Sequence, residues 1–168
     1  MAQIAANPWS FTTSDAATST SISSIVSKGH SALVTTSTSH GLSAYNAIAI
    51  QAPSVAGYAG GFKVASVLSA TTFLIRGDFA GLASAGASGN VLTAAYLPRL
   101  RIEQALWCNP GANATVLVTD CYGNQLYSNT TVASTGADQV FTSGKLFWTG
   151  LGLVINTLSS GTLQLTIN

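Results

Sequence analysis

Short runs of β-branched and aromatic residues, interrupted by Gly, Asn, Pro or Ser, extend through most of this sequence. Such runs are typical of β-strands, and the residues between them favour tight turns. No stretch keeps the i, i+3, i+4, i+7 apolar spacing of an amphipathic helix, and the helix formers Glu, Lys and Arg are rare. The sequence therefore predicts an all-β protein built from antiparallel sheets.

The expected strands fall into two modules. Residues 22–79 predict a small barrel-like module, and residues 99–168 predict a module of the sandwich or jelly-roll kind, because turn signals recur there at suitable spacings. Between them, residues 80–98 are mostly Ala, Gly, Ser and Leu and end at Pro98, which predicts a linker or crossover. The strands are expected at 31–37, 46–51, 61–68, 71–77, 99–108, 113–120, 124–132, 145–149, 151–157 and 161–167.

Residues 1–21 are expected to form an extended N-terminal arm. Asn7-Pro8 disfavours a helix, and the Ser/Thr tract that follows is too polar to build a core alone. Trp9 and Phe11 are large apolar side chains in this polar segment, and leaving them in water would forgo roughly 1.5–3 kcal/mol of burial each. We therefore expect both to bind a partner, with the arm docked on an adjacent chain.

The chain carries few charges. Its 168 residues include six Lys and Arg and five Asp and Glu, which amounts to 7% against about 25% in a typical protein, and the net charge is +1. No cluster of Lys and Arg provides the basic stripe of a nucleic-acid groove. Subunits packed against one another tolerate such a surface better than a free monomer does, so we expect a homo-oligomer that also contacts other proteins.

The mean hydropathy is positive, at +0.39, yet the sequence predicts no contact with a membrane. The most apolar stretch, residues 82–97, consists of small residues broken by Gly, Ser and Asn. Residues 1–20 contain no Lys or Arg and no continuous apolar run, so we expect no signal peptide.

The two histidines raise the question of catalysis. His40-Gly41 lies between two expected strands, where Gly supplies a positive φ and a polar turn explains both residues. A Ser-His-Asp site would need an orienting acid and an oxyanion site, but there is no G-x-S-x-G motif and Asp78 is a single acid. The spacing between His30 and His40 matches no standard metal motif. We interpret His40 as a turn residue and expect no catalytic residue, no metal and no cofactor.

The carboxylates and aromatic side chains offer weaker alternatives. The five acids are scattered, whereas a glycosidase needs two carboxylates that converge on one cleft. Aromatic residues gather between 107 and 148, where they could stack on a sugar but more often fill a core. Phe147 and Trp148 are adjacent in an expected strand and so face opposite sides, which makes one of them a candidate contact with a partner.

One stretch carries a resemblance. VTTSTSHGLSAYNAIAI…GGFKVASVLSATTFLIRG, within 34–77, joins a Thr-rich strand, HGL, an alternating apolar strand, a Gly-initiated F-x-V strand and S-A-T-T-F. It resembles a β-module that recurs in structural proteins of tailed bacteriophages, although Ala44-Tyr45 stands where that module usually has a Gly. The opening ANPWSFTTSDA resembles the N-terminal arms of such proteins. The resemblance covers about a quarter of the chain and carries over no catalytic residue.

This resemblance implies a component of a phage virion. We expect a non-enzymatic structural protein, a capsid cement or decoration protein that binds and stabilises the assembled shell. It would be assembled in the host cytoplasm and contact copies of itself and other virion proteins such as the major capsid protein. A neck or tail component remains an alternative, as does a receptor- or glycan-binding module of a tail fibre that uses the aromatic residues of 107–148.

Overall fold

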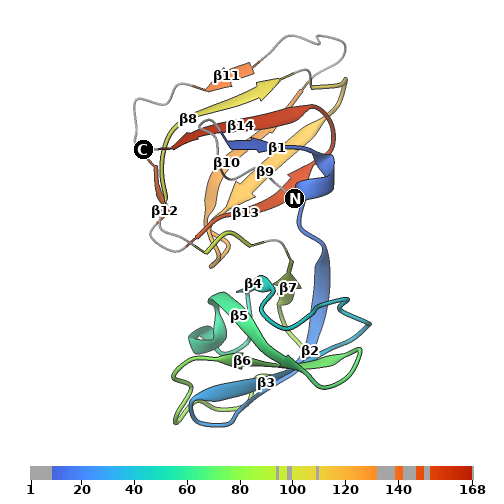
Figure 1. Ribbon diagram of the computed structural model, residues 1–168, viewed down its shortest axis with the longest axis vertical. Coiled ribbons are helices and arrows are strands. Elements are labelled where there is room, and N and C mark those ends of the chain that lie inside the picture. The colour runs from blue at the N-terminus through green and yellow to red at the C-terminus, as the bar shows by residue number, and fades with distance from the viewer. Residues whose placement is uncertain are drawn as a thin grey trace. The chain divides into compact units, whose positions relative to one another are not determined.

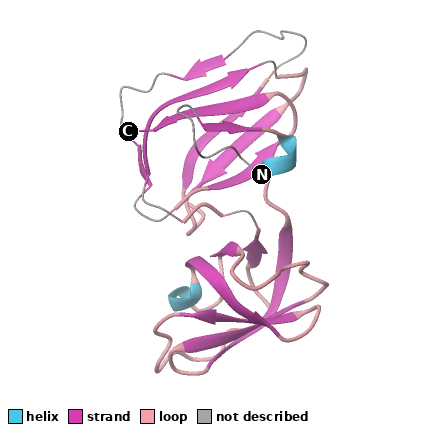
Figure 2. Cartoon of the chain, viewed as in Figure 1, coloured by secondary structure: helices cyan, strands magenta, loops and turns pink. Residues whose placement is uncertain are grey.

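A computed structural model of the chain describes residues 9–93, 95–97, 100–108, 110–131, 139–141, 147–149 and 152–167. In this part of the chain the regular structure is strand, apart from two short 3₁₀ turns, η1 (Thr13–Asp15) and η2 (Ala56–Tyr58) (Figure 2). Neighbouring strands run antiparallel throughout the described pairs. The all-β, antiparallel fold predicted from the sequence is therefore confirmed.

The first of two compact units comprises Thr18–Leu97 together with Cys121–Gly123 and contains a closed six-stranded barrel (Figure 1). The strands follow the order β2-β3-β6-β5-β4-β7, and β7 pairs with β2 to close the ring. Their bounds are β2 (Ser19–Ser27), β3 (Ser31–Thr36), β4 (Ala47–Gln51), β5 (Gly60–Val67), β6 (Thr72–Arg76) and β7 (Asn90–Leu92).

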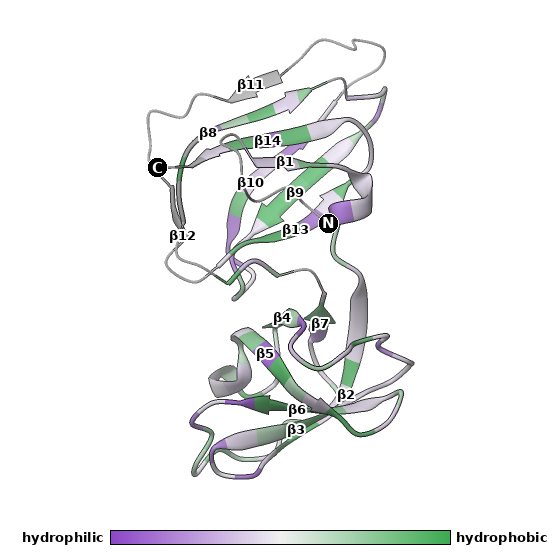
Figure 3. Ribbon diagram, viewed as in Figure 1, coloured by the Kyte–Doolittle hydropathy of each residue, from purple (hydrophilic) through white to green (hydrophobic). Residues whose placement is uncertain are grey.

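The barrel core follows from alternation along these strands. In β3, Ala32, Val34 and Thr36 are buried while the residues between them are partly exposed, as a period of two requires. Tyr58 and Phe79 come from connections rather than strands, and their rings pack 5.5 Å apart. Figure 3 shows apolar residues spaced along the strands rather than gathered in long runs. The core contains Ile22, Ile25, Ala32, Val34, Leu42, Ile48, Ile50, Tyr58, Val64, Phe73, Ile75, Phe79, Ala85 and Val91.

The second unit comprises Met1–Ala17, Pro98–Asp120 and Asn124–Asn168 and contains two antiparallel sheets. One sheet has the order β1-β14-β8-β11, with β12 also paired to β8, and the other has the order β10-β9-β13. Leu163 and Leu165 of the first sheet and Val116 and Val118 of the second are buried, so each sheet contributes one face to a sandwich core. The bounds are β1 (Trp9–Phe11), β8 (Leu100–Cys108), β9 (Thr115–Thr119), β10 (Gln125–Thr130), β11 (Gln139–Phe141), β12 (Phe147–Thr149), β13 (Val154–Leu158) and β14 (Thr162–Ile167).

The structure divides the N-terminal region differently from the arm predicted over 1–21. Residues 9–11 form strand β1, which pairs with β14 of the same chain, and β2 already begins at Ser19. The Ser/Thr tract becomes a barrel strand because Thr20 and Ile22 are buried while the serines on either side of each, Ser19, Ser21 and Ser23, are exposed. Residues 1–8 of the predicted arm lie outside the described residues.

The linker predicted over 80–98 belongs largely to the barrel unit, which extends to Leu97. Its residues 90–92 form β7, which pairs with both β2 and β4, and Ala85 forms an isolated bridge to Ile25. Small residues permit this close approach. A Cβ at Gly89 would lie 2.4 Å from the backbone oxygen of Gln51, so only Gly fits beside β4 there.

Candidate functional site

Trp9 and Phe11, which the sequence proposes as partner contacts, lie on β1 at the edge of their own sheet. Phe11 is fully buried, and Trp9 is partly buried with its ring 6.4 Å from that of Phe11 in an edge-to-face arrangement. The Phe11 side chain is therefore packed inside its own sandwich, where a partner cannot contact it. Of the two, Trp9 alone keeps surface that a partner could reach in this structure.

Phe147 and Trp148 lie on β12, which pairs with β8 opposite Ile102 and Arg101. Their side chains lie outside the described residues, so which of the two faces outward stays a prediction.

His40 is more than a turn residue, because its side chain is buried in the barrel. Its backbone N–H donates to Ala70 O at 3.0 Å, and its Nδ1 accepts the N–H of Leu42 at 2.9 Å. The imidazole also packs edge-to-face against Phe73, with ring centroids 5.1 Å apart. The next residue, Gly41, has φ +61°, which makes the predicted turn possible. His40 therefore anchors the 37–46 loop to the core.

The hydrogen bond to Leu42 fixes the chemistry of this imidazole. Because Nδ1 accepts a hydrogen bond, a neutral His40 carries its proton on Nε2. Nε2 is buried and has no hydrogen-bond partner among the described residues. No described hydroxyl or thiol is therefore paired with this nitrogen, as nucleophilic catalysis would require.

A cavity of about 630 Å³ lies in the barrel unit, with His40 in its wall. None of its described lining residues carries an acidic or basic side chain other than this imidazole. The Thr93 hydroxyl in its wall accepts the backbone N–H of Thr18 at 3.0 Å. The cavity therefore presents neutral hydroxyl and amide groups beside small apolar surfaces. Its polar lining consists of Thr18, Thr20, Ser39, His40, Asn46 and Thr93.

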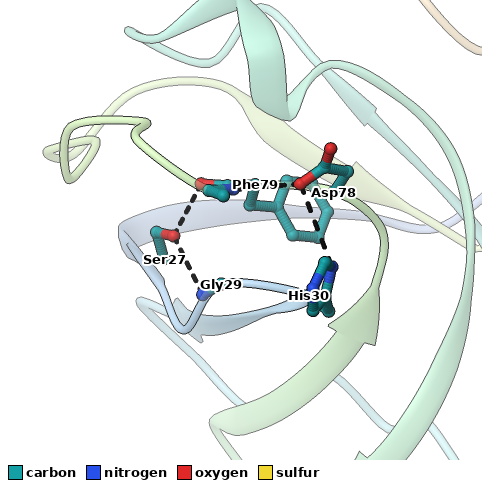
Figure 4. A network of polar contacts seen from close by, with 6 residues as sticks. Ser27, Gly29, His30, Asp78 and Phe79 are labelled. Atoms are coloured by element: carbon teal, nitrogen blue, oxygen red, sulfur yellow. Dashed lines mark hydrogen bonds and ion pairs between the residues drawn. The ribbon is translucent and has the colours of Figure 1, made fainter.

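A second histidine lies near a serine and an aspartate at the β2–β3 turn (Figure 4). His30 Nδ1 and Asp78 Oδ1 are 4.0 Å apart, and both side chains are exposed. Ser27 Oγ instead donates to Phe79 O at 2.7 Å and accepts the N–H of Gly29 at 3.3 Å. The serine thus holds the turn together, and a 4.0 Å contact between two exposed side chains contributes little stability.

Two further titratable groups, Asp120 and Tyr127, lie in the sandwich unit. Asp120 is buried at the β9–β10 turn, where its two carboxylate oxygens accept the N–H and the side-chain amide of Asn124 at 2.9 and 2.7 Å. Burial raises the pKa of the Tyr127 phenol above its ordinary value. Within the described ranges, no group of three or more His, Cys, Asp or Glu side chains converges as a metal site would require.

Sequence reasoning did not single out Tyr45, the most exposed large apolar residue of the described part. Its φ of +69° lies in the left-handed region that favours glycine. The available signal was the pair Ala44-Tyr45, which stands where the resemblance expected from the sequence predicts a glycine.

Comparison of the chain with protein-family models, with curated proteins and with solved structures found no match. Among the residues that the structure describes, none forms a helix with the length and apolarity needed to cross a bilayer.

Proposed function

We propose that this protein is a non-enzymatic structural protein of a phage virion, a cement or decoration protein that binds the assembled capsid. The observation that carries this proposal is the chemistry of its surface. Most exposed residues in the described part are Ser, Thr, Ala and Gly, and only 7% of the whole chain is charged. The segment that resembles a phage module, 34–77, contains strands β4, β5 and β6 and the second half of β3.

Such a surface favours broad contact with protein. Ala and Gly lose no side-chain entropy when they are immobilised, whereas each Lys or Arg loses up to about 2 kcal/mol. Because the surface has few charges, the free-energy penalty for desolvating ions at an interface is also small. Binding to the assembled shell and not to free subunits would stabilise the shell by mass action, by about 2.7 kcal/mol per site at a hundredfold excess over Kd.

The experiment uses capsids purified from phage in which the gene has been deleted. The purified protein is added at increasing concentration, and bound protein is measured by co-sedimentation. We expect saturable binding at a fixed ratio to the major capsid protein, together with a higher temperature of capsid disruption. Absence of binding, or binding that saturates at a few copies per particle, would contradict the cement function, and the second result would favour a neck or tail site.

The neutral cavity beside His40 favours one second candidate, a glycan-binding module of a tail fibre. Sugars present hydroxyl groups, which the Thr, Ser and Asn side chains of the wall can bind. A glycan array probed with the purified protein tests this. Binding that Thr20→Val abolishes, with the barrel still folded, would support the glycan candidate over the cement function.

A further inference from the structure

The 37–46 loop forms half of the wall of the cavity beside His40. Five of the ten described residues that line the cavity belong to this loop, namely Ser39, His40, Gly41, Leu42 and Asn46. The cavity therefore keeps its shape only while the loop lies on the barrel.

Two kinds of contact hold the loop on the hairpin formed by strands β5 and β6. Near one end of the loop, His40 N donates to Ala70 O at 3.0 Å. Near the other end, Tyr45 N donates to Val64 O at 2.8 Å. Between these points Leu42 is buried, and its N–H donates to His40 Nδ1 at 2.9 Å. The middle of the loop therefore depends on an imidazole nitrogen that can accept a hydrogen bond.

A protonated His40 cannot make this hydrogen bond. Both nitrogens of an imidazolium carry a hydrogen, so Nδ1 would turn an N–H toward the N–H of Leu42. The other nitrogen, Nε2, is buried and has no hydrogen-bond partner among the described residues, so it offers no compensation. The ring packs on Phe73 and is 6% exposed, which leaves water little access to a charge on it. The loop in its closed position therefore disfavours the imidazolium.

The barrel unit offers a single carboxylate to neutralise such a charge. Asp78 is the one Asp or Glu in the sequence of this unit, residues 18–97 and 121–123. It lies beside His30 and follows the C-terminal end of β6, whereas His40 is bonded to the turn that precedes β6. The carboxylate is therefore at the opposite end of the strand from His40.

The elements that pack against His40 supply cations rather than anions. Strands β5 and β6 carry Lys63 and Arg76, both exposed, and strands β2 and β4 contain no charged residue. The loop itself and the segment after β7 add the phenols of Tyr45 and Tyr96, and a phenol has no negative charge to offer in acid. An imidazolium at this position would thus be buried without an opposite charge beside it.

We propose that protonation of His40 releases the 37–46 loop, so that acid opens the cavity wall that the loop forms at neutral pH. A histidine exposed by release of the loop takes up a proton at about pH 6.5, so below that pH the released state binds one proton more than the closed state. The closed loop is therefore favoured at neutral pH and loses stability as the pH falls. If the closed state binds no proton, the released fraction rises about thirtyfold between pH 7.5 and pH 5. This inference goes beyond the proposed function, because it concerns a conformational change within the barrel unit.

Amide hydrogen exchange of the ¹⁵N-labelled full chain, followed by NMR at pH 7.5 and pH 5, tests the proposal. The rates are expressed as protection factors, which remove the pH dependence of the exchange chemistry itself. We expect the protection factor of the Leu42 amide to fall at least tenfold at pH 5, while those of the β3 amides change less than threefold. An equal loss in β3 would mean that the whole barrel unfolds, and it would contradict a local release of the loop.

His40→Asn separates the charge of the imidazole from its hydrogen bond. An asparagine at position 40 can accept the N–H of Leu42 with its own side-chain oxygen, as in an Asx-turn, and it does not titrate. Its Leu42 protection factor should therefore agree within threefold at the two pH values. His30→Asn, which removes the exposed histidine, is the matched control and should show the same loss as the wild-type protein.

Three further results would overturn the proposal. The first is a wild-type Leu42 protection factor that is the same at both pH values. The second is an equal loss in the His40→Asn and wild-type proteins, because a group other than His40 would then be responsible. The third is a His40 ring whose NMR signals show protonation at pH 5 while the Leu42 amide stays protected; this measurement needs only the wild-type protein. Capsid binding is measured separately, so the proposed function can fail or stand independently of these results.

Discussion

Replacing Phe11 by alanine tests whether β1 belongs to its own sandwich. Phe11 is fully buried, opposite Leu163 of β14. Removing a buried phenylalanine side chain loses its transfer free energy and leaves a cavity, and together these cost about 3–5 kcal/mol. Because β1 is a three-residue edge strand, it can detach locally, which limits the loss to the free energy that holds it on β14. We expect a loss of about 3 kcal/mol in the free energy of unfolding.

Tryptophan fluorescence during urea unfolding is a suitable assay. Trp9, Trp107 and Trp148, the three tryptophans of the chain, all belong to the sandwich unit, so their emission reports on that unit. Ser10→Ala is the matched control, because Ser10 lies on the same strand and points to the other face. It should change the unfolding free energy by less than about 0.5 kcal/mol.

A Phe11→Ala protein that unfolds at the same urea concentration as the Ser10→Ala protein would refute this reasoning. It would mean that residue 11 is not packed in its own sheet, and the arm predicted from the sequence to dock on a neighbouring chain would again be the better description.

Substitutions at four positions of the barrel unit give three further predictions. Gly89→Ala should lower the free energy of unfolding of the barrel by about 2 kcal/mol or more, measured by thermal unfolding. The reason is that φ at this position is +80° and the new Cβ would clash with the backbone oxygen of Gln51. Gly86→Ala is the control and should be nearly neutral, because its Cβ would meet nothing within 4 Å. His40→Ala should lower the free energy of unfolding by about 2–3 kcal/mol, because it leaves the N–H of Leu42 without its acceptor and removes the packing on Phe73. Unchanged hydrogen exchange at the Leu42 amide would contradict this. The Tyr45→Gly protein should be more stable to unfolding than the Tyr45→Ala protein by about 0.5–1 kcal/mol, because Gly adopts the positive φ at this position without strain. At most positions Ala is the more stabilising of the two. Equal urea midpoints for the two variants would argue against strain at this position.

Much of the fold could be predicted because apolar and polar residues alternate along most of the strands, and this alternation is visible in the sequence. Every strand expected from the pattern corresponds to a strand of the structure, as with Leu163 and Leu165, which are buried in β14. β2 was missed because its outward residues are mostly serines, so the strand resembles a polar linker although Thr20, Ile22 and Ile25 are buried. β7 was missed because three residues in a tract of Ala, Gly and Ser carry no pattern.

What could not be predicted depends on pairing across long sequence distances. Barrel closure joins Ser19 to Leu92 and Ser21 to Asn90, and no local signal fixes that register. An extended segment with Trp9 and Phe11 can complete its own sheet or a neighbour's, and composition does not distinguish the two. The burial of His40 and the exposure of Tyr45 are set by how the 37–46 loop lies along the hairpin.

Quantitative mass spectrometry of purified virions, with an isotope-labelled copy of this chain as the reference, tests the central proposal most directly. A cement protein of the capsid must be present in a fixed ratio to the major capsid protein, at many copies per particle, and must remain after washing in high salt because few of its contacts are ionic. Absence of the chain from purified virions would contradict a structural role, and presence at only a few copies per particle would contradict its placement on the capsid.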